Sequence, residues 1–358
     1  MSKLNIIPVF VPHYGCPNDC IFCNQRKITN KNYADDLIKT RLDIEEYLTF
    51  FSNKNQETQI AFYGGSFTGL SEDVMIEYLK LANFFIDKNL VNSIRLSTRP
   101  DYINDSILEI LKYYNVKTIE LGVQSLDDDV LYYNNRGHNS HTVFKASEKI
   151  KEYGFELGLQ QMIGLYKDNY EKSLRTAKRF VEIGPKFVRI YPTLVIKDTK
   201  LEDLFLKGIY KPLTIDEAIN IIKPIYIMYS LNSIDVIRIG LQPTDNINEG
   251  KDVVAGPFHA AFRQLLLQEI FKEMSSKELS LFENGEEISI IANNKNISYL
   301  VGNKGINKKY YSSEFNINKI KFIGTKEDNS KVIIKSNIEK IKIDIYNYYR
   351  EYLRNLEV

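Results

Sequence analysis

The sequence predicts an α/β protein whose main part is a curved, partial (β/α)6 barrel. From residue 6 to about residue 200, short runs rich in β-branched and aromatic residues alternate with longer amphipathic segments. The runs predicted as strands cover 6–12, 58–65, 93–98, 118–124, 156–164 and 187–196. Six repeats of a strand and a helix imply a parallel sheet, and a curved partial barrel is its natural closure.

The segments between these strands are predicted helices, for example 72–89 and 141–154, and the second ends on a glycine that suits a helix C-cap. The sequence changes character after about residue 246, where a polar loop leads into a helix. Residues 288–311 follow as two strand-like runs with a glycine-containing turn. We therefore expect the partial barrel over residues 1–245. A small α+β domain that binds substrate or RNA is expected over 246–358.

Composition sets only broad limits on function. The chain of 358 residues is 44% hydrophobic and 26% charged, which is typical of a globular protein. Its net charge of +1 neither requires nor excludes nucleic acid, so a phosphate-binding surface would have to be a local patch. The apolar run near the start is too short for a membrane span and lacks the pattern of a signal peptide. We expect a cytoplasmic protein without membrane contact.

All three cysteines lie in one short stretch, "CPNDCIFC", as Cys16, Cys20 and Cys23. Such crowding in a reducing compartment favours a metal site over disulfides. A structural zinc ion needs four ligands, and His13 is near enough in sequence to be the fourth, so a zinc site stays open as an alternative. A 4Fe–4S cluster held by only three thiolates would instead keep one iron open for a substrate or cofactor.

The C-x3-C-x2-C spacing after a first strand resembles the signature of the radical S-adenosylmethionine (SAM) superfamily. The resemblance implies a partial TIM barrel with Cys16, Cys20 and Cys23 as ligands of a 4Fe–4S cluster. The cluster's open iron would bind SAM and cleave it to a 5′-deoxyadenosyl radical. Phe22 matches the position that packs near the adenine. An electron donor such as flavodoxin or ferredoxin is implied as a partner, and no separate catalytic residue is assigned.

Further motifs follow the next strands, at the edge where a barrel of this kind carries its chemistry. "YGGSF" (63–67) resembles the superfamily's Gly-Gly-acidic stretch, although a serine stands where an acidic residue is common. The resemblance implies SAM contacts by the residues Gly64, Gly65, Ser97, Arg99, Glu120, Gln124 and Met162. The alternatives are a plain turn for the glycines, hydrogen-bond partners in the core or surface ion pairs for the polar residues, and a core position for the methionine.

The segment "VRIYPTLVIKDTKLEDLFLKGIYKPL" (188–213) resembles the catalytic subunit of Elongator, a tRNA-modifying enzyme, and "STRPDYI", "ELGVQSLDDDVL" and "NNRGH" do so too. No acetyltransferase signature follows residue 215. The resemblance therefore implies an Elongator-like radical enzyme that acts on RNA, specifically tRNA, without acetyltransferase activity. The same chemistry on a small molecule or protein, and a non-catalytic zinc-binding RNA module, remain alternatives.

The tail contains "GNKGINKK" (302–309), in which Gly-x-x-Gly precedes a lysine pair. In KH modules such a loop clamps a nucleic-acid backbone. The predicted contact residues are Gly302, Lys304, Gly305, Lys308 and Lys309. An ordinary turn with solvent-exposed lysines is the alternative.

Overall fold

The computed structural model describes residues 4–11, 19–24, 33–51, 56–241, 251–283, 285–326 and 328–356. Its main sheet has seven strands in the order β1-β2-β3-β4-β5-β6-β8, and every neighbouring pair is parallel. The strands are β1 (Asn5–Val11), β2 (Thr58–Gly64), β3 (Ser93–Thr98), β4 (Val116–Gln124), β5 (Glu156–Ile163), β6 (Phe187–Pro192) and β8 (Asp235–Ile239). The predicted α/β partial barrel is confirmed, and β8 extends its six predicted strands by one.

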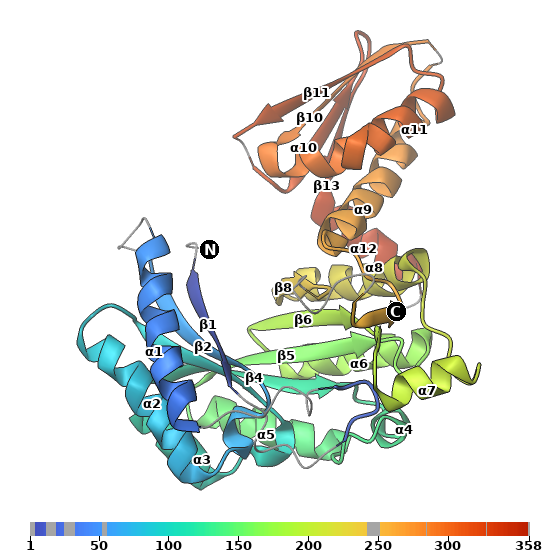
Figure 1. The fold of residues 1–358 in the computed structure, drawn as a ribbon. Helices are drawn as coiled ribbons and strands as arrows, with labels where there is room; N and C mark the ends of the chain where they lie inside the picture. The colour runs from blue at the N-terminus through green and yellow to red at the C-terminus, as the bar shows by residue number, and fades with distance from the viewer. Residues whose placement is uncertain are drawn as a thin grey trace.

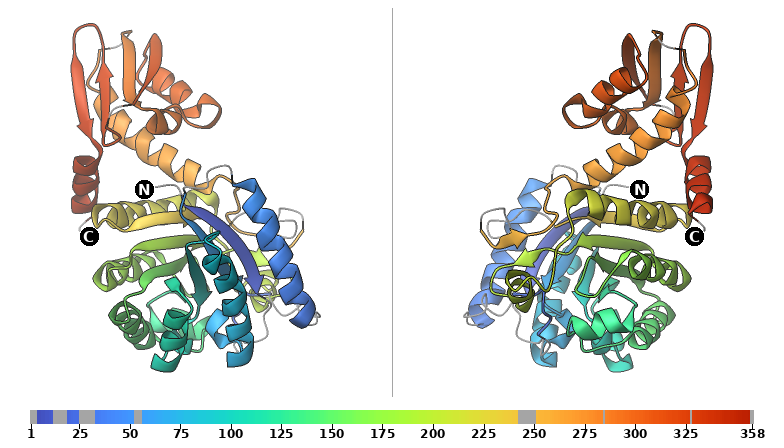
Figure 2. Two further views of the ribbon diagram at one scale, coloured as in Figure 1. Left: turned by 90° about the vertical axis from the view of Figure 1, so that its left-hand side faces the viewer. Right: turned by 90° about the vertical axis from the view of Figure 1, so that its right-hand side faces the viewer.

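Most of the helices that follow the strands lie on the outer side of the curved sheet (Figures 1 and 2). These are α1 (Tyr33–Phe50), α2 (Glu72–Asp87), α3 (Asp105–Tyr113), α5 (Ser140–Glu152), α6 (Tyr170–Ile183) and α8 (Ile215–Leu231). The short helices α4 (Asp128–Tyr133) and α7 (Lys200–Leu206) lie instead beyond the carboxyl ends of the strands. Several begin where the sequence supplies a capping side chain, and Asn104, Asn139 and Asn169 each accept the amide three residues on. None of the described helices combines the length and apolarity that a membrane span needs.

The two sides of the strands carry different chemistry. Ile60, Phe62 and Met75 are buried with the helices of the outer layer, where the Phe62 ring stacks on a neighbouring phenylalanine. Polar residues Arg95 and Glu120 occupy alternate positions of β3 and β4 and hydrogen-bond to each other. Since side chains alternate across a strand, the polar side forms the inner face of the barrel.

The predicted strand 187–196 is interrupted after Pro192. Residues Val195–Ile196 form a separate short strand, β7, which pairs antiparallel with β9 (Val253–Ala255). The chain therefore leaves the main sheet at Pro192 and crosses its carboxyl edge before α7 begins.

The C-terminal part forms a second sheet in the order β11-β10-β12-β13. Its elements are α9 (Phe262–Leu279), β10 (Glu287–Asn293), α10 (Asn294–Val301), α11 (Ile306–Glu314), β11 (Lys319–Thr325), β12 (Lys331–Lys335), β13 (Lys340–Asp344) and α12 (Ile345–Asn355). The second strand-like run expected within 288–311 is wrong, because it forms helix α10, which Asn293 caps. The domain boundary expected at 245/246 falls outside the described residues and stays a prediction.

Candidate cofactor site at the carboxyl ends of the strands

The cysteine loop, residues 16–24, follows β1, and the structure describes its second half. Cys20 is buried and Cys23 is half-buried, and the Cys23 amide donates to the Cys20 carbonyl at 3.0 Å. Cys16 and His13 lie outside the described residues. Within the described ranges, no group of three His, Cys, Asp or Glu side chains is close enough to hold a metal ion.

The segment after β6 packs against the cysteine loop and holds it in place. The Leu201 amide donates to the Ile21 carbonyl at 2.7 Å, and the Asn24 side chain donates to the Lys197 carbonyl at 2.5 Å. Ile21 is buried in a small apolar cluster with Val195, Leu201 and Tyr210, and Phe22 packs against it. The Elongator-like segment 188–213 thus holds the loop that carries the cysteines.

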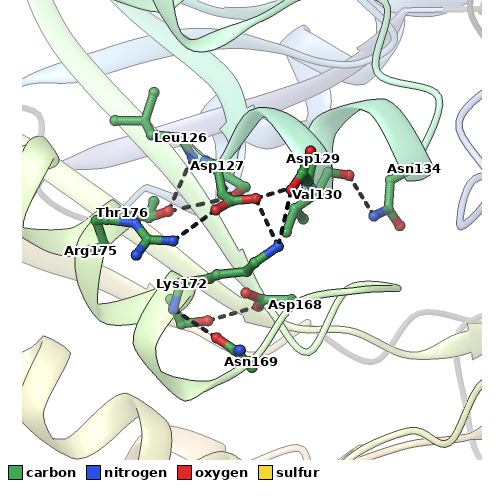
Figure 3. A network of polar contacts seen from close by, with 12 residues as sticks. Leu126, Asp127, Asp129, Val130, Asn134, Asp168, Asn169, Lys172, Arg175 and Thr176 are labelled. Atoms are coloured by element: carbon green, nitrogen blue, oxygen red, sulfur yellow. Dashed lines mark hydrogen bonds and ion pairs between the residues drawn. The ribbon is translucent and has the colours of Figure 1, made fainter.

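A second support comes from the segment after β4, which Figure 3 shows from close by. The Asp127 carboxylate forms ion pairs with Lys172 at 3.0 Å and Arg175 at 2.8 Å, which tie this segment to α6. The side-chain amide of Asn134 donates to the Val130 carbonyl at 2.7 Å. The backbone carbonyl of Asn134 accepts a hydrogen bond from the backbone amide of Ile21 in the cysteine loop. The cysteine loop is therefore fixed to the barrel through two separate segments.

Two buried guanidinium groups approach the sulfur of Cys20. The Arg136 Nη1 atom lies 3.3 Å from it and the Arg99 Nη1 atom 3.9 Å, and the two residues are only 5% and 4% exposed. Asp101 holds the Arg99 guanidinium through two hydrogen bonds of 2.9 Å. Arg136 donates to the Gly122 carbonyl, and Arg99 donates to the Arg136 carbonyl. Paired cationic donors suit a sulfur that carries negative charge as a metal ligand.

His138 contacts Arg136, and its Nε2 atom lies 3.5 Å from the Arg136 Nη2 atom. Burial, and then the charge of Arg136, lowers the pKa of His138 to about 4, so the imidazole is neutral at physiological pH. The buried atoms Nδ1 of His138, Nε of Arg136 and Oε1 of Gln124 have no hydrogen-bond partner among the described residues. Since such orphaned atoms each cost about 1–3 kcal/mol, they indicate that the site accepts a polar ligand.

The other predicted SAM-contact residues lie at or near the same ends of the strands. Gly64 ends β2 with a φ of +106°, and a Cβ there would come within 2.8 Å of the Val11 carbonyl oxygen, so only glycine fits. Gly65 follows it. Ser97 is half-buried on β3, Gln124 ends β4 in a buried position, and Met162 is half-buried on β5. The residues present fit a polar, SAM-like group bound beside a cysteine-held metal centre.

Glu120 lies deeper in the barrel, and its contacts favour a role as a hydrogen-bond partner in the core. It is 3% exposed and accepts from Arg95 at 3.1 Å, from Arg189 at 2.5 and 3.1 Å and from the Tyr63 hydroxyl at 3.4 Å. Burial lowers the pKa of Arg189, but the Glu120 charge more than offsets this, and the net effect is a raised pKa. Burial and Glu120 raise the pKa of Tyr63 to about 12.

In the predicted nucleic-acid segment, 302–309, residues 302–305 connect α10 and α11, and residues 306–309 are the first turn of helix α11. Gly302 has a φ of +75° and is buried, and a Cβ there would meet Asn307 at 2.9 Å. Its amide donates to Ser298, the Asn303 amide donates to Gln268 at 2.8 Å, and the Gly305 amide donates back to Gly302. These three amides are thus already used, whereas Lys304, Lys308 and Lys309 are exposed. Nucleic-acid contact by this loop stays a prediction.

Arg136 is not among the predicted site residues. It lies in the motif "NNRGH", which contributes to the Elongator resemblance, but a loop arginine before a helix N-cap is usually solvated. The contact that places Arg136 in the site spans 116 residues of sequence, and no local signal reveals it.

Comparisons with known proteins place these features in a family. The radical SAM superfamily profile matches residues 10–191, and the profile of the radical SAM C-terminal domain matches 185–274. An uncharacterized protein of Methanocaldococcus jannaschii is 29% identical over 232 residues, which cover 62% of this chain and 70% of that protein. A tRNA uridine(34) acetyltransferase of the same organism is 32% identical over 130 residues, covering 36% of this chain and 24% of that enzyme.

Elongator complex protein 3 of Saccharomyces cerevisiae is 28% identical over 266 residues, covering 62% of this chain and 48% of that protein. Among solved structures, an N-terminally truncated Elp3 of Methanocaldococcus infernus shares the fold, with a TM-score of 0.59 and 19% identity over 78% of this chain and 64% of that one. The chain spans about half or less of the acetyltransferase and Elongator relatives it matches. The superfamily match covers half of the sequence and falls on the barrel that carries the cysteine loop, and the chain therefore belongs to the radical SAM superfamily.

Proposed function

We propose that this radical SAM enzyme holds one 4Fe–4S cluster through Cys16, Cys20 and Cys23 and uses SAM to modify tRNA. When bound and reduced, such a cluster supplies the electron that cleaves SAM to methionine and a 5′-deoxyadenosyl radical. The observation that carries the proposal is the pair of buried guanidinium groups at the Cys20 sulfur, beside buried polar atoms that have no partner among the described residues.

Different residues of the chain are proposed to balance charge at the cluster, to position Arg136 and to contact SAM. Arg136 and Arg99 donate to Cys20 and balance the negative charge that thiolate ligands bring. The neutral ring of His138 keeps Arg136 in place without adding a further positive charge. The backbone at Gly64 and Gly65 and the side chains of Ser97, Gln124, Phe22 and Met162 are the proposed contacts of SAM.

tRNA is proposed as the substrate because several relatives carry the name tRNA uridine(34) acetyltransferase or Elongator complex protein 3. The acetyl transfer in the first name is stated of those longer proteins and is not part of this proposal. A small flavodoxin or ferredoxin is the proposed electron donor.

The test is anaerobic reconstitution with iron and sulfide, followed by reduction with dithionite in the presence of SAM. The expected result is release of 5′-deoxyadenosine, measured by mass spectrometry, and its loss in Cys23→Ser. Adding unfractionated tRNA is expected to raise the rate and to yield a new modified nucleoside after digestion. A colourless protein with one zinc ion and no 5′-deoxyadenosine would contradict the cluster. A rate of 5′-deoxyadenosine release that does not change when tRNA is added, together with unmodified tRNA nucleosides, would contradict tRNA as the substrate.

A further inference from the structure

The C-terminal sheet has one face covered by helices and one face without such cover (Figures 1 and 2). Residues Ile288, Ile290, Val332 and Ile334 of β10 and β12 are buried toward α9, α10 and α11. Because side chains alternate along a strand, the residues between them point to the opposite side. We call this opposite side the open face, and it consists of Glu287, Ser289, Ile291 and Asn293 of β10, Lys319, Lys321, Ile323 and Thr325 of β11, Lys331, Ile333 and Lys335 of β12, and Lys340, Lys342 and Asp344 of β13.

Strand register arranges the open face in rows across the sheet. One row reads Lys321, Ser289, Lys335 and Lys340, and the next reads Ile323, Ile291, Ile333 and Lys342. With strands about 4.8 Å apart, each row spans roughly 14 Å. The face thus offers a basic strip and an apolar strip side by side.

Positive charge is concentrated here and only partly balanced. The open face has six lysines and two acidic residues, a net charge of +4, whereas the whole chain has +1. Glu287 lies 3.8 and 3.9 Å from Lys319 and Lys321, and Lys331 pairs with Asp328 at 3.3 Å. In the part of the chain that the structure describes, Lys335, Lys340 and Lys342 have no acidic partner within 4 Å.

Two of these three lysines face each other directly. Lys335 and Lys340 are opposite one another in the antiparallel β12–β13 pair, and like charges in that position destabilise a sheet. Both are exposed, and Lys342 lies in the neighbouring row. A cluster of lysines that the described acidic residues do not neutralise is suited to bind an external polyanion.

We propose that the open face binds the phosphate backbone of the RNA substrate. This inference rests on the proposed function and deepens it, because it assigns RNA binding to residues outside the barrel. Lys335, Lys340 and Lys342, which have no acidic partner among the described residues, contact phosphates. Ile323, Ile291 and Ile333 of the apolar strip pack against sugars and the faces of unpaired bases. The α10–α11 loop is less suited to clamp a backbone, since three of its amides already have partners.

The experiment measures binding of unfractionated, fluorescently labelled tRNA to the full-length protein by anisotropy at several salt concentrations. The test variant is K335Q/K340Q/K342Q. The matched control, K304Q/K308Q/K309Q, removes three lysines that are also exposed but belong to the α10–α11 segment on the other side of the same sheet. Circular dichroism confirms that both variants are folded.

The expected result for the test variant is a salt slope reduced by about 2, because each lost contact to single-stranded RNA contributes about 0.7. Its affinity falls by at least about tenfold at low salt, whereas RNA-independent 5′-deoxyadenosine release is unchanged. The control binds like the wild-type protein.

Wild-type affinity in the test variant would overturn the inference and leave the proposed function standing, and the face would then serve another partner, such as an acidic protein. A loss in the control that matches or exceeds the loss in the test variant would overturn it in favour of the loop. A wild-type protein that binds no tRNA would overturn the inference together with the tRNA part of the proposed function.

Discussion

Replacing Glu120 with glutamine is expected to destabilise the protein strongly, because this carboxylate is the acidic partner of two guanidinium groups inside the barrel. Arg95 and Arg189 are 8% and 15% exposed at their side chains, and both donate to Glu120. In E120Q the positive charges of Arg95 and Arg189 stay buried without their counter-ion. The NH2 group of the new glutamine also faces these guanidinium groups, which are donors themselves and cannot accept its hydrogen bonds.

The magnitude follows from the geometry. Removing one partner from a buried ion pair costs about 3–5 kcal/mol, because it leaves an uncompensated charge out of water. The glutamine oxygen still accepts one or two of the four hydrogen bonds that Glu120 accepts, so we place the loss in unfolding free energy near the lower end, at about 3 kcal/mol.

The assay is urea unfolding followed by circular dichroism, with E156Q as the matched control. Glu156 also pairs with two cations, Lys186 and Lys117, but these are 54% and 43% exposed. Its loss is therefore expected to cost less than about 1 kcal/mol. In the double variant E120Q/R189Q one orphaned charge is gone, so its loss should be smaller than the sum of the single losses. An E120Q variant no less stable than E156Q would refute the reasoning.

Three further predictions concern single residues. Burial raises the pKa of Asp168 to about 6, above its unfolded value of about 3.8, so its contribution to stability is full at low pH and is lost as the pH rises through 6. Lowering the pH from 7.5 to 5 should therefore add about 1.4 kcal/mol from this group to the unfolding free energy, a gain that D168N lacks in parallel urea titrations. Gly64→Ala should lower the melting temperature more than Gly208→Ala, since both have positive φ but only the first clashes with a neighbouring strand; equal shifts would contradict the clash. The variant Arg136→Gln should release iron from the reconstituted protein about tenfold faster. The reason is that a hydrogen bond to a charged Cys20 sulfur is worth about 1.5 kcal/mol or more. Unchanged iron content after repeated desalting would argue against a role of Arg136 in stabilising the cluster.

Elements with strong local patterns were predictable from the sequence. The β-rich run 93–98 is strand β3, and the segment 141–154 is helix α5 to within two residues, because periodicity and end signals agree there. The run "NISYLV" predicts a strand because it contains β-branched and aromatic residues, and this prediction is wrong. It forms α10 because Asn293 caps its start and the helix packs on α9. Strand β8 has only five residues, and its pairing with β6 makes it part of the sheet.

The candidate site was predictable only in its motifs. The spacing of the cysteines identifies a loop and its chemistry, because all the information is local. The partners of that loop are long-range: Arg136 reaches Cys20 across 116 residues, and Arg189 reaches Glu120 across 69. The motif groups Glu120 with the cofactor residues, and a SAM contact of this residue stays a prediction. Its motif does not reveal that Glu120, four positions before the end of β4, pairs with two guanidinium groups of the barrel interior.

The most direct test of the account is electron paramagnetic resonance of the anaerobically reconstituted and reduced protein, recorded before and after SAM is added. Cys16, Cys20 and Cys23 are proposed to leave one iron open. We therefore predict about four iron ions per chain and a spectrum that changes when SAM binds. No such signal is expected when Cys16 is replaced by serine. A protein that takes up one zinc ion instead, and loses it in His13→Ala, would contradict the account.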